Sequence, residues 1–301
     1  MHTWKLVSIW VPSYNRPDYL RVLLQSILEQ TYHNFEVIIY DDGSPRYKEI
    51  EEVIHQLNDP RFFLFRGENV GFIKNWNRTL LQCKWEYIKI IGDDDILLPK
   101  CIEEQYMVLE NNKAIWFVCC DFNVVNASWL PVLNKYFTQS SYRIFQCDTI
   151  ENWHDFIKNY FLGKRKVWFP GAILFPREII SIIGNFDETI GSPVDIDYLL
   201  SISHCRSLYY LDKKLVSVRW HDNLSKKLEL DIEHYRNIVK LVVKHFYVIY
   251  KELTILDKIK IFLPWKSPPL SAYKIPLDTL CVFCESLRIS SKILYTTRCN
   301  E

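Results

Sequence analysis

The chain has no excess of charge of either sign, and this balance argues against one class of function, the binding of nucleic acids. Its 301 residues include 37 Lys and Arg against 36 Asp and Glu, and no stretch interleaves basic with aromatic residues. Grooves that bind nucleic acids are basic, either overall or along one face. The sequence therefore predicts no nucleic-acid partner, and any recognition of phosphate has to be local.

Long apolar runs are missing as well. No stretch reaches the roughly 18 uncharged apolar residues that a membrane-spanning helix needs, and residues 1–14 contain no cleavage site of the kind that ends a signal peptide. The nine cysteines show no framework spacing, which fits reduced thiols. Cys281 and Cys284 have the spacing of half a zinc site, and buried structural thiols are the alternative. We expect a cytoplasmic protein.

Two common nucleotide-binding motifs are also absent. Neither G-x-G-x-x-G nor G-x-x-x-x-G-K occurs, which argues against a dinucleotide-dependent dehydrogenase and a P-loop enzyme. What the sequence does contain is an alternation of apolar strands (5–11, 35–40, 62–65, 86–91, 114–120) with segments of helical spacing. This alternation predicts an α/β fold with a mostly parallel central sheet. The loops 12–17, 41–46, 66–71 and 92–98 should then converge at one edge.

The second half of the sequence is less regular. We expect a helix over 150–162, a strand over 171–175, a helix over 177–183, a helix from about 195, two strands within 208–219 and a long amphipathic helix over 228–252.

Three consecutive carboxylates, Asp93, Asp94 and Asp95, follow the strand 86–91. They repel one another unless a cation or hydrogen-bond donors compensate. Oxygen ligands suit Mg²⁺ and Mn²⁺, and Mg²⁺ usually combines one or two protein carboxylates with substrate phosphates. The triplet therefore predicts Mn²⁺ or Mg²⁺ as cofactor, together with a nucleoside diphosphate. The alternative is a solvated acidic turn that caps the next helix.

Four segments now point to a family. VPSYNRPDYL (11–20), YDDGS (40–44), ENVGFIKNWN (68–77) and IIGDDDILLP (90–99) resemble, in order and spacing, the signatures of family 2 inverting glycosyltransferases with the GT-A fold. The resemblance covers about residues 5–225. It implies a single Rossmann-like nucleotide-binding domain over 1–225, with a nucleotide-binding half (1–120) and an acceptor half (121–225). A C-terminal helical appendage would follow over 226–301.

The resemblance also implies a nucleotide site, which residue by residue comprises Pro12, Tyr14, Arg16, Asp41, Asp42, Arg66, Asn69, Gly71, Asn75 and Asp93. An Asp can accept hydrogen bonds from a uracil N–H or a ribose hydroxyl, and an Arg can pair with a phosphate. Two alternatives stay open. The Asp41–Gly43 segment could be an ordinary Asp-Gly turn, and Lys74 could take the phosphate in place of Arg66.

The metal ligands implied by the resemblance are Asp94, Asp95 and His221. Asp94 falls on the metal-binding carboxylate of the family motif. Gly92 stands where the commoner form has its first Asp, so the division of roles within the triplet is not fixed. His221, in VRWHDNLS (218–225), could instead be a structural histidine.

An inverting transfer needs a general base that deprotonates the acceptor hydroxyl. Asp195 matches the family's base, although Val194 replaces the usual Glu, and Asp197 is the competing candidate. Either carboxylate could instead cap the helix that begins there. The segment that contains Trp168, Phe169 and Gly171 resembles the one that surrounds the donor sugar and the acceptor.

The wider resemblance is to bacterial enzymes that assemble O-antigen or capsule repeat units. It implies UDP-glucose or UDP-galactose as donor and a polyprenyl-diphosphate-linked saccharide, such as GlcNAc-diphosphate-undecaprenol, as acceptor. Residues 244–301 carry nine Lys or Arg against five Asp or Glu, so they could lie on the inner face of the bacterial plasma membrane. Packing on the domain's own core is the alternative. A metal-dependent phosphohydrolase and a non-catalytic carbohydrate-binding module are the rival functions.

Overall fold

The computed structural model describes residues 4–132, 149–152, 155–158, 169–204, 207–220, 232–250 and 254. Its first half contains β1 (Val7–Ser13), α1 (Pro17–Leu28), β2 (Phe35–Asp41), α2 (Tyr47–Leu57), β3 (Phe62–Arg66), α3 (Phe72–Gln82), β4 (Tyr87–Ile90), β5 (Ile96–Leu97), α4 (Cys101–Asn111) and β6 (Ile115–Val125). Its second half contains β7 (Thr149–Glu151), η1 (Pro170–Ala172), β8 (Ile173–Pro176), α7 (Ile179–Ile183), α8 (Val194–Ser203), β9 (Ser207–Arg219) and α10 (Ile232–Tyr250).

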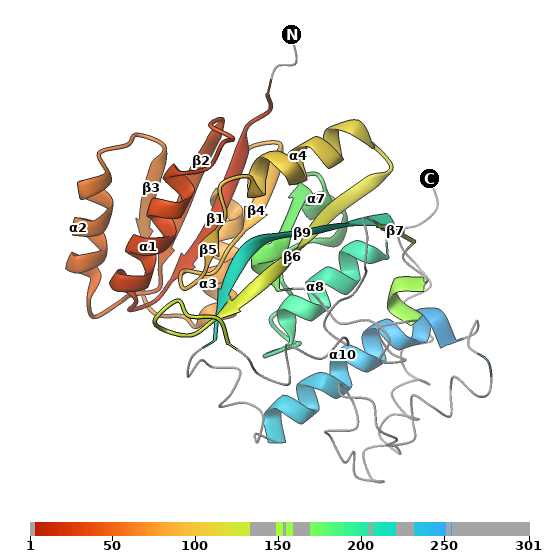
Figure 1. Cartoon of the computed structure of the whole chain (residues 1–301). Coiled ribbons are helices and arrows are strands. Elements are labelled where there is room, and N and C mark those ends of the chain that lie inside the picture. The colour runs from red at the N-terminus through yellow and green to blue at the C-terminus, as the bar shows by residue number, and fades with distance from the viewer. Residues whose placement is uncertain are drawn as a thin grey trace.

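One sheet runs through the described structure in the order β3-β2-β1-β4-β8-β6-β9-β5, with β7 paired to β9. Strands β1 to β4 are parallel to one another, and β8 is inserted antiparallel between β4 and β6. Because β6 is antiparallel to β8 and parallel to β9, both run in the same direction as β1. The mostly parallel α/β sheet is confirmed, and the carboxyl ends of its main strands share one edge (Figure 1).

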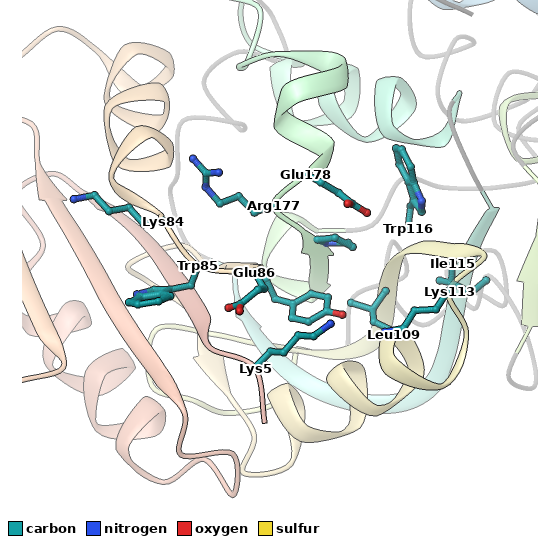
Figure 2. Close-up of a pocket in the computed structure, with 12 residues that line it drawn as sticks. Lys5, Lys84, Trp85, Glu86, Leu109, Lys113, Ile115, Trp116, Arg177 and Glu178 are labelled. Atoms are coloured by element: carbon teal, nitrogen blue, oxygen red, sulfur yellow. The ribbon is translucent and has the colours of Figure 1, made fainter. Parts of the chain in front are cut away.

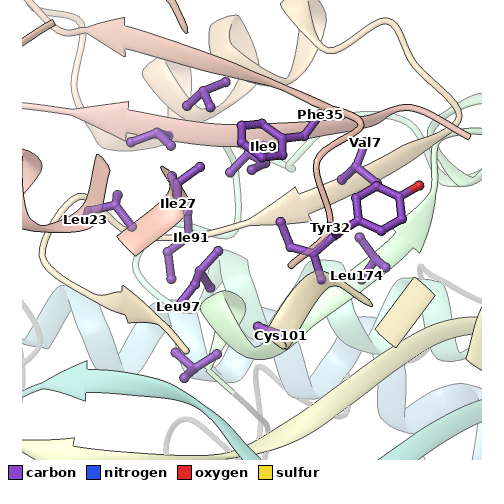
Figure 3. Close-up of a cluster of buried hydrophobic side chains, with 14 of the residues drawn as sticks. Val7, Ile9, Leu23, Ile27, Tyr32, Phe35, Ile91, Leu97, Cys101 and Leu174 are labelled. Carbon is purple, nitrogen blue, oxygen red and sulfur yellow. The ribbon is translucent and has the colours of Figure 1, made fainter. Parts of the chain in front are cut away.

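Helices cover both faces of this sheet. Alternate residues of β1 point to opposite sides, so Val7 and Ile9 contact the cluster under α1, α2 and α4, while Trp10 contacts the cluster under α3, α7 and α8. Figure 3 shows the first cluster, in which Leu23 and Ile27 of α1 lie beside Ile9. Fully burying one such aliphatic side chain stabilises the fold by roughly 1.5–3 kcal/mol. These two clusters hold the strand ends, and with them the loops of the site, in fixed relative positions.

The helix expected over 228–252 is present as α10, which packs against α8 and buries Leu241 and Val242 in the second cluster (Figure 1). Within the described residues, no helix is both long and apolar enough to cross a membrane. The predicted boundary between 225 and 226 lies outside the described residues, so the division into a domain and an appendage stays a prediction.

Two local expectations were wrong. The segment 208–219 is a single strand, β9, because Asp212 and Lys213 form an irregularity in its pairing with β6 where a turn was expected. The helix expected over 150–162 begins later, since 149–151 form β7 and only 155–158 are described as helix. Residues 153–154 and 159–168 lie outside the described part.

Candidate active site

The loop after β1 is tied to two other loops by hydrogen bonds. Ser13 Oγ donates to Asp93 Oδ2 at 2.9 Å, and the Tyr14 backbone N–H reaches the same oxygen at 3.3 Å. The Asn15 N–H donates to Ser44 Oγ at 2.7 Å. Pro12 is part of β1, and the Tyr14 side chain is about half exposed at this edge. Three of the predicted loops therefore meet at one place.

The two carboxylates after β2 are buried and hold loops. Asp42 accepts the backbone N–H groups of Val70 and Gly71 at 2.9 and 3.0 Å. Asp41 accepts the backbone N–H and the hydroxyl of Ser44, which is the hydrogen bonding of the Asp-Gly turn considered above. Both carboxylates thus shape the edge, and contact with uracil or ribose stays a prediction for each.

The third loop adds residues that differ widely in exposure. The Arg66 guanidinium lies over the Tyr47 ring at 4.1 Å, and half of its side chain is exposed. Asn75 is buried, and its Nδ2 donates to the Tyr40 carbonyl at 3.0 Å while its Oδ1 has no hydrogen-bond partner. Lys74 and Gly71 are exposed at the surface. Asn69 lies so close to Gly43 that a Cβ there would meet the Asn69 backbone nitrogen at 2.7 Å.

The acidic triplet begins three residues after the end of β4, and an arginine of the first loop contacts two of its carboxylates. Arg16 Nη1 donates to Asp93 Oδ1 at 3.1 Å and to Asp94 Oδ2 at 2.7 Å. Burial, together with the charge of Asp94, raises the pKa of Asp93 to about 6, and the same two causes raise the pKa of Asp95 well above its usual value. Arg16 offsets only part of the negative charge of three adjacent carboxylates, which favours a further cation beside the triplet.

We tested whether the triplet fits a divalent metal from its oxygen positions. A Cβ built on Gly92 would lie 3.0 Å from Asp94 Oδ1 and 3.4 Å from Asp95 Oδ2, and one on Gly171 would lie 3.5 Å from the same Asp95 oxygen. The Asp94 and Asp95 oxygens therefore lie close to one point beside Gly92, where the absence of a side chain leaves room for them. Among the described residues no group of three or more His, Cys, Asp or Glu side chains could hold a metal. Two carboxylates completed by substrate phosphates fit the usual Mg²⁺ pattern.

Asp95 is held from its other side by the end of β9. The Arg219 N–H donates to Asp95 Oδ1 at 3.0 Å. The Arg219 guanidinium is buried between the rings of Tyr19 and Trp129, at 3.8 and 3.7 Å, and its Nε and Nη2 have no hydrogen-bond partner. Sequence reasoning missed this residue, although an Arg at the end of an apolar strand next to His221 was visible as a signal. His221 itself lies outside the described residues.

The predicted base, Asp195, lies at the start of α8. The topology places the start of this helix at the edge of the sheet where the acidic triplet lies. Because α8 directly precedes β9, whose start lies at the far edge, the first turn of α8 lies near the carboxyl ends of the strands (Figure 1). Asp195 Oδ1 accepts the Ile196 N–H at 2.8 Å, and burial raises the pKa of Asp195 to about 6. Asp197 instead points to α10, where Lys244 Nζ lies 2.9 Å from its Oδ2.

The segment predicted to surround the sugars is only partly described. Gly171 is buried, and a Cβ on it would meet Ile91 Cδ1 at 2.8 Å, so a larger residue here would have to displace the end of the Ile91 side chain. Its carbonyl accepts a 2.8 Å hydrogen bond from Lys89, a fully buried lysine of β4 that sequence reasoning missed. Phe169 stacks edge-on against Phe122. Trp168 lies outside the described residues.

A separate cavity of about 520 Å³ opens at the opposite edge of the sheet, between Trp85 and Trp116 (Figure 2). Three of its charged residues have partners: Lys5 and Lys113 both pair with Glu110, and Arg177 Nε donates to a backbone carbonyl. The cavity lies at the starts of β1, β4 and β6, away from the carboxylates described above. The edge with the triplet is therefore the candidate active site.

Comparisons with known proteins agree with this picture. The sequence model described as glycosyl transferase family 2 matches residues 8–168, more than half of the chain. An uncharacterized glycosyltransferase of Rickettsia typhi is 26% identical over 281 residues, which cover 90% of this chain and 84% of that protein. A putative colanic acid biosynthesis glycosyl transferase, WcaA of Escherichia coli, is 35% identical over 95 residues, which cover 31% of this chain and 34% of that protein.

Solved structures give the fold. The structure of S. aureus TarS 1–349 in complex with UDP-GlcNAc has a TM-score of 0.61 at 15% identity and covers 96% of this chain and 83% of its own. The mannosyltransferase PcManGT from Pyrobaculum calidifontis, in complex with GDP-Man and Mn²⁺, has a TM-score of 0.60 at 13% identity and covers 97% of this chain and 76% of its own. The GT-A fold that the sequence predicts is confirmed.

Proposed function

Because this chain belongs to glycosyl transferase family 2, we propose that it transfers a hexose from UDP-glucose or UDP-galactose to a lipid-diphosphate-linked saccharide, with inversion at the anomeric carbon. GlcNAc-diphosphate-undecaprenol is the acceptor we favour. The relation to a putative colanic acid biosynthesis enzyme supports a role in surface polysaccharide assembly, and TarS, which binds UDP-GlcNAc, supports a uridine diphosphate donor.

The observation that carries the proposal is the joining of four loops at one edge. Ser13 contacts Asp93, and Asn15 contacts Ser44. Asp42 holds Val70 and Gly71. This arrangement forms one polar surface for a nucleotide and a diphosphate, next to the space lined by Asp94 and Asp95. A plain acidic turn would not require the first loop to be bonded to it, nor the second and third loops to be joined to the first in turn.

The proposed chemistry is a single displacement. Asp195 accepts the proton of the acceptor hydroxyl while that oxygen attacks the anomeric carbon, and the bond from this carbon to the diphosphate oxygen breaks, so UDP leaves with the bonding electrons. Asp94 and Asp95 would hold Mn²⁺ or Mg²⁺, which supplies charge stabilisation for the leaving diphosphate. Asp195 suits the base role because its raised pKa makes it a stronger base than an exposed carboxylate.

Calorimetric titration with UDP, with and without Mn²⁺, tests the donor site. We expect Mn²⁺ to increase UDP affinity in the wild type, and we expect the increase to vanish in Asp94→Ala. Glu52→Ala is a matched control, because it removes an exposed carboxylate from α2, far from the triplet. The proposed metal site would be overturned if UDP affinity were the same with and without Mn²⁺ and the same in Asp94→Ala as in the wild type.

Product analysis separates the transferase from its rivals. Incubation of UDP-glucose or UDP-galactose with GlcNAc-diphosphate-undecaprenol and Mn²⁺ should give a disaccharide lipid and UDP in equal amounts. Release of phosphate or UDP that needs no acceptor would indicate a phosphohydrolase. Glycan binding without nucleotide binding would indicate a carbohydrate-binding module.

Association with the membrane that carries such an acceptor is part of the same proposal. Its support is the charge of residues 244–301, nine Lys or Arg against five Asp or Glu. Cosedimentation of the full chain with vesicles containing anionic lipid tests it, with vesicles of neutral lipid as the control. A chain that stays in the supernatant with both kinds of vesicle would remove this part.

A further inference from the structure

A buried polar cluster joins α8 to α10 and lies outside the segment that the family model matches. Asp197 is 2% exposed, and its Oδ2 accepts a hydrogen bond from Lys244 Nζ at 2.9 Å. Its Oδ1 lies 2.8 Å from His245 Nε2, and His245 Nδ1 lies 2.9 Å from His204 Nε2. Lys244 Nζ also donates to Asp187 Oδ2 at 3.0 Å. The donor-site chemistry uses none of these contacts.

One ammonium, that of Lys244, lies between two carboxylates in this cluster. Burial lowers the pKa of Lys244, but the carboxylates of Asp197 and Asp187 outweigh burial, so the net pKa is raised and the ammonium stays charged. Burial lowers the pKa of His245, which is therefore neutral near pH 7. Since a carboxylate only accepts, His245 must donate from Nε2 to Asp197 and accept at Nδ1 from His204. Removing one partner would leave an unpaired buried charge.

The loop that leads into α8 is fastened to α10 as well. Lys240 Nζ donates to the Thr189 carbonyl at 3.0 Å. Gly191 has a φ of 75°, and a Cβ on it would lie 2.2 Å from Asn237 Nδ2. The Asn237 side chain thus fills the space directly over Gly191. Both the helix start and the loop before it take their position from α10.

Helix geometry connects this anchor to the proposed base. Residues two apart in an α-helix lie about 200° apart around its axis. When Asp197 is fixed toward α10, Asp195 must therefore project from the opposite side of the same turn. We propose that Lys244 and His245 are positioning residues, which orient Asp195 toward the acceptor through their hold on Asp197. The inference rests on the proposed role of Asp195.

The test compares two substitutions on α10. Lys244→Met removes the cation that binds Asp197, whereas Arg236→Met removes an exposed cation that pairs only with Glu233 of the same helix among the described contacts. We expect Lys244→Met to lower kcat by about tenfold or more with UDP affinity unchanged, because the donor loops lie on other elements. Lys244→Arg should restore most of the turnover, and Arg236→Met should behave as the wild type.

A second measurement needs no acceptor. Amide hydrogen exchange across 194–203 should become faster by about tenfold or more in Lys244→Met and in the milder His245→Gln, and stay unchanged in Arg236→Met. The inference would be overturned if Lys244→Met showed the same amide exchange and the same turnover as the wild type. It would also be overturned if Lys244→Met lost UDP binding and turnover to the same extent. If Asp195→Asn also keeps full turnover, the proposed base is wrong; if only Asp195→Asn is inactive, the positioning role alone is wrong.

Discussion

Arg16 reaches from the loop after β1 to Asp94 in the loop after β4, with 2.7 Å between Nη1 and Oδ2. The same nitrogen lies 3.1 Å from Asp93 Oδ1. The chain thus supplies one cation to its own acidic triplet, so a divalent ion bound by Asp94 shares that carboxylate with a guanidinium. The resemblance placed Arg16 on the nucleotide, and its contacts in the structure are with these two carboxylates.

Removing Arg16 should make the triplet a stronger metal site in the absence of nucleotide. We expect Arg16→Met to lower the unfolding temperature without metal, because the carboxylates lose their counterion, and to bind Mn²⁺ more tightly than the wild type. Calorimetric titration with Mn²⁺ measures the affinity. Arg21→Met, which changes an exposed arginine of α1, is the control. Equal Mn²⁺ affinity in Arg16→Met and the wild type would contradict the prediction.

The raised pKa of Asp93 predicts how stability depends on pH. The ordinary pKa of 3.8 applies to the unfolded chain, while burial and the charge of Asp94 raise it to about 6 in the fold. Between these values the folded state binds more protons, so stability falls as pH rises from about 4 to about 6, by on the order of 2–3 kcal/mol. Asp95 acts in the same direction.

Thermal unfolding of metal-free protein across this pH range measures the effect. Asp93→Asn should remove much of the slope, because an amide does not titrate. Added Mn²⁺ should reduce it too, since a cation favours the charged carboxylates. A slope that is the same in the wild type and in Asp93→Asn would assign the pH dependence to other groups.

Asp195→Asn should abolish transfer while UDP binding is retained, because the amide cannot accept the acceptor's proton. In the wild type, kcat/KM should fall about tenfold per pH unit below about pH 6, where Asp195 becomes protonated. Steady-state kinetics across pH and calorimetry with UDP check both statements. A variant that binds UDP and keeps full turnover would move the base role elsewhere.

Gly43→Ala should weaken UDP binding by about tenfold or more, since the new Cβ would lie 2.7 Å from the Asn69 nitrogen and displace the loop that Asp42 holds. Gly184→Ala is a matched control. Both glycines have positive φ, 71° and 83°, but a Cβ at Gly184 would meet nothing within 4 Å. Strain alone should lower the stability of both variants by roughly 1–2 kcal/mol, whereas only Gly43→Ala should lose UDP affinity.

The parts of this molecule that sequence predicted are those set by local patterns. Apolar runs such as 35–40 and helical spacing such as that of Leu20, Leu23 and Leu24 gave the elements of the first half, and the rule for parallel strands placed the loops at one edge. The charged pair Asp212 and Lys213 misled the same reasoning, because a bulge within a strand and a turn between strands have similar local composition.

The parts that sequence could not predict depend on distant partners. Lys89 contacts a carbonyl 82 residues away, and Asp197 contacts residues 47 and 48 positions later in the chain. No local pattern reports such pairs. A lysine inside an apolar strand signals that some buried acceptor exists, without identifying it. Sequence likewise kept both Asp195 and Asp197 as candidates for the base, whereas the structure shows that Asp197 contacts Lys244 and His245 of α10 and that Asp195 bonds to the Ile196 N–H of its own helix.

The antiparallel β8 strand has a mechanical consequence. By pairing with β4 on one side and β6 on the other, it joins the strands that end in the donor loops to the strands that end beside Asp95 in one continuous ladder of hydrogen bonds. Such a ladder transmits force and does not hinge, so the two halves cannot close on a substrate as separate rigid bodies. Within the part of the chain that the structure describes, the loops at this edge can move at a cost far below that of bending the sheet, so we expect them to enclose the reacting groups.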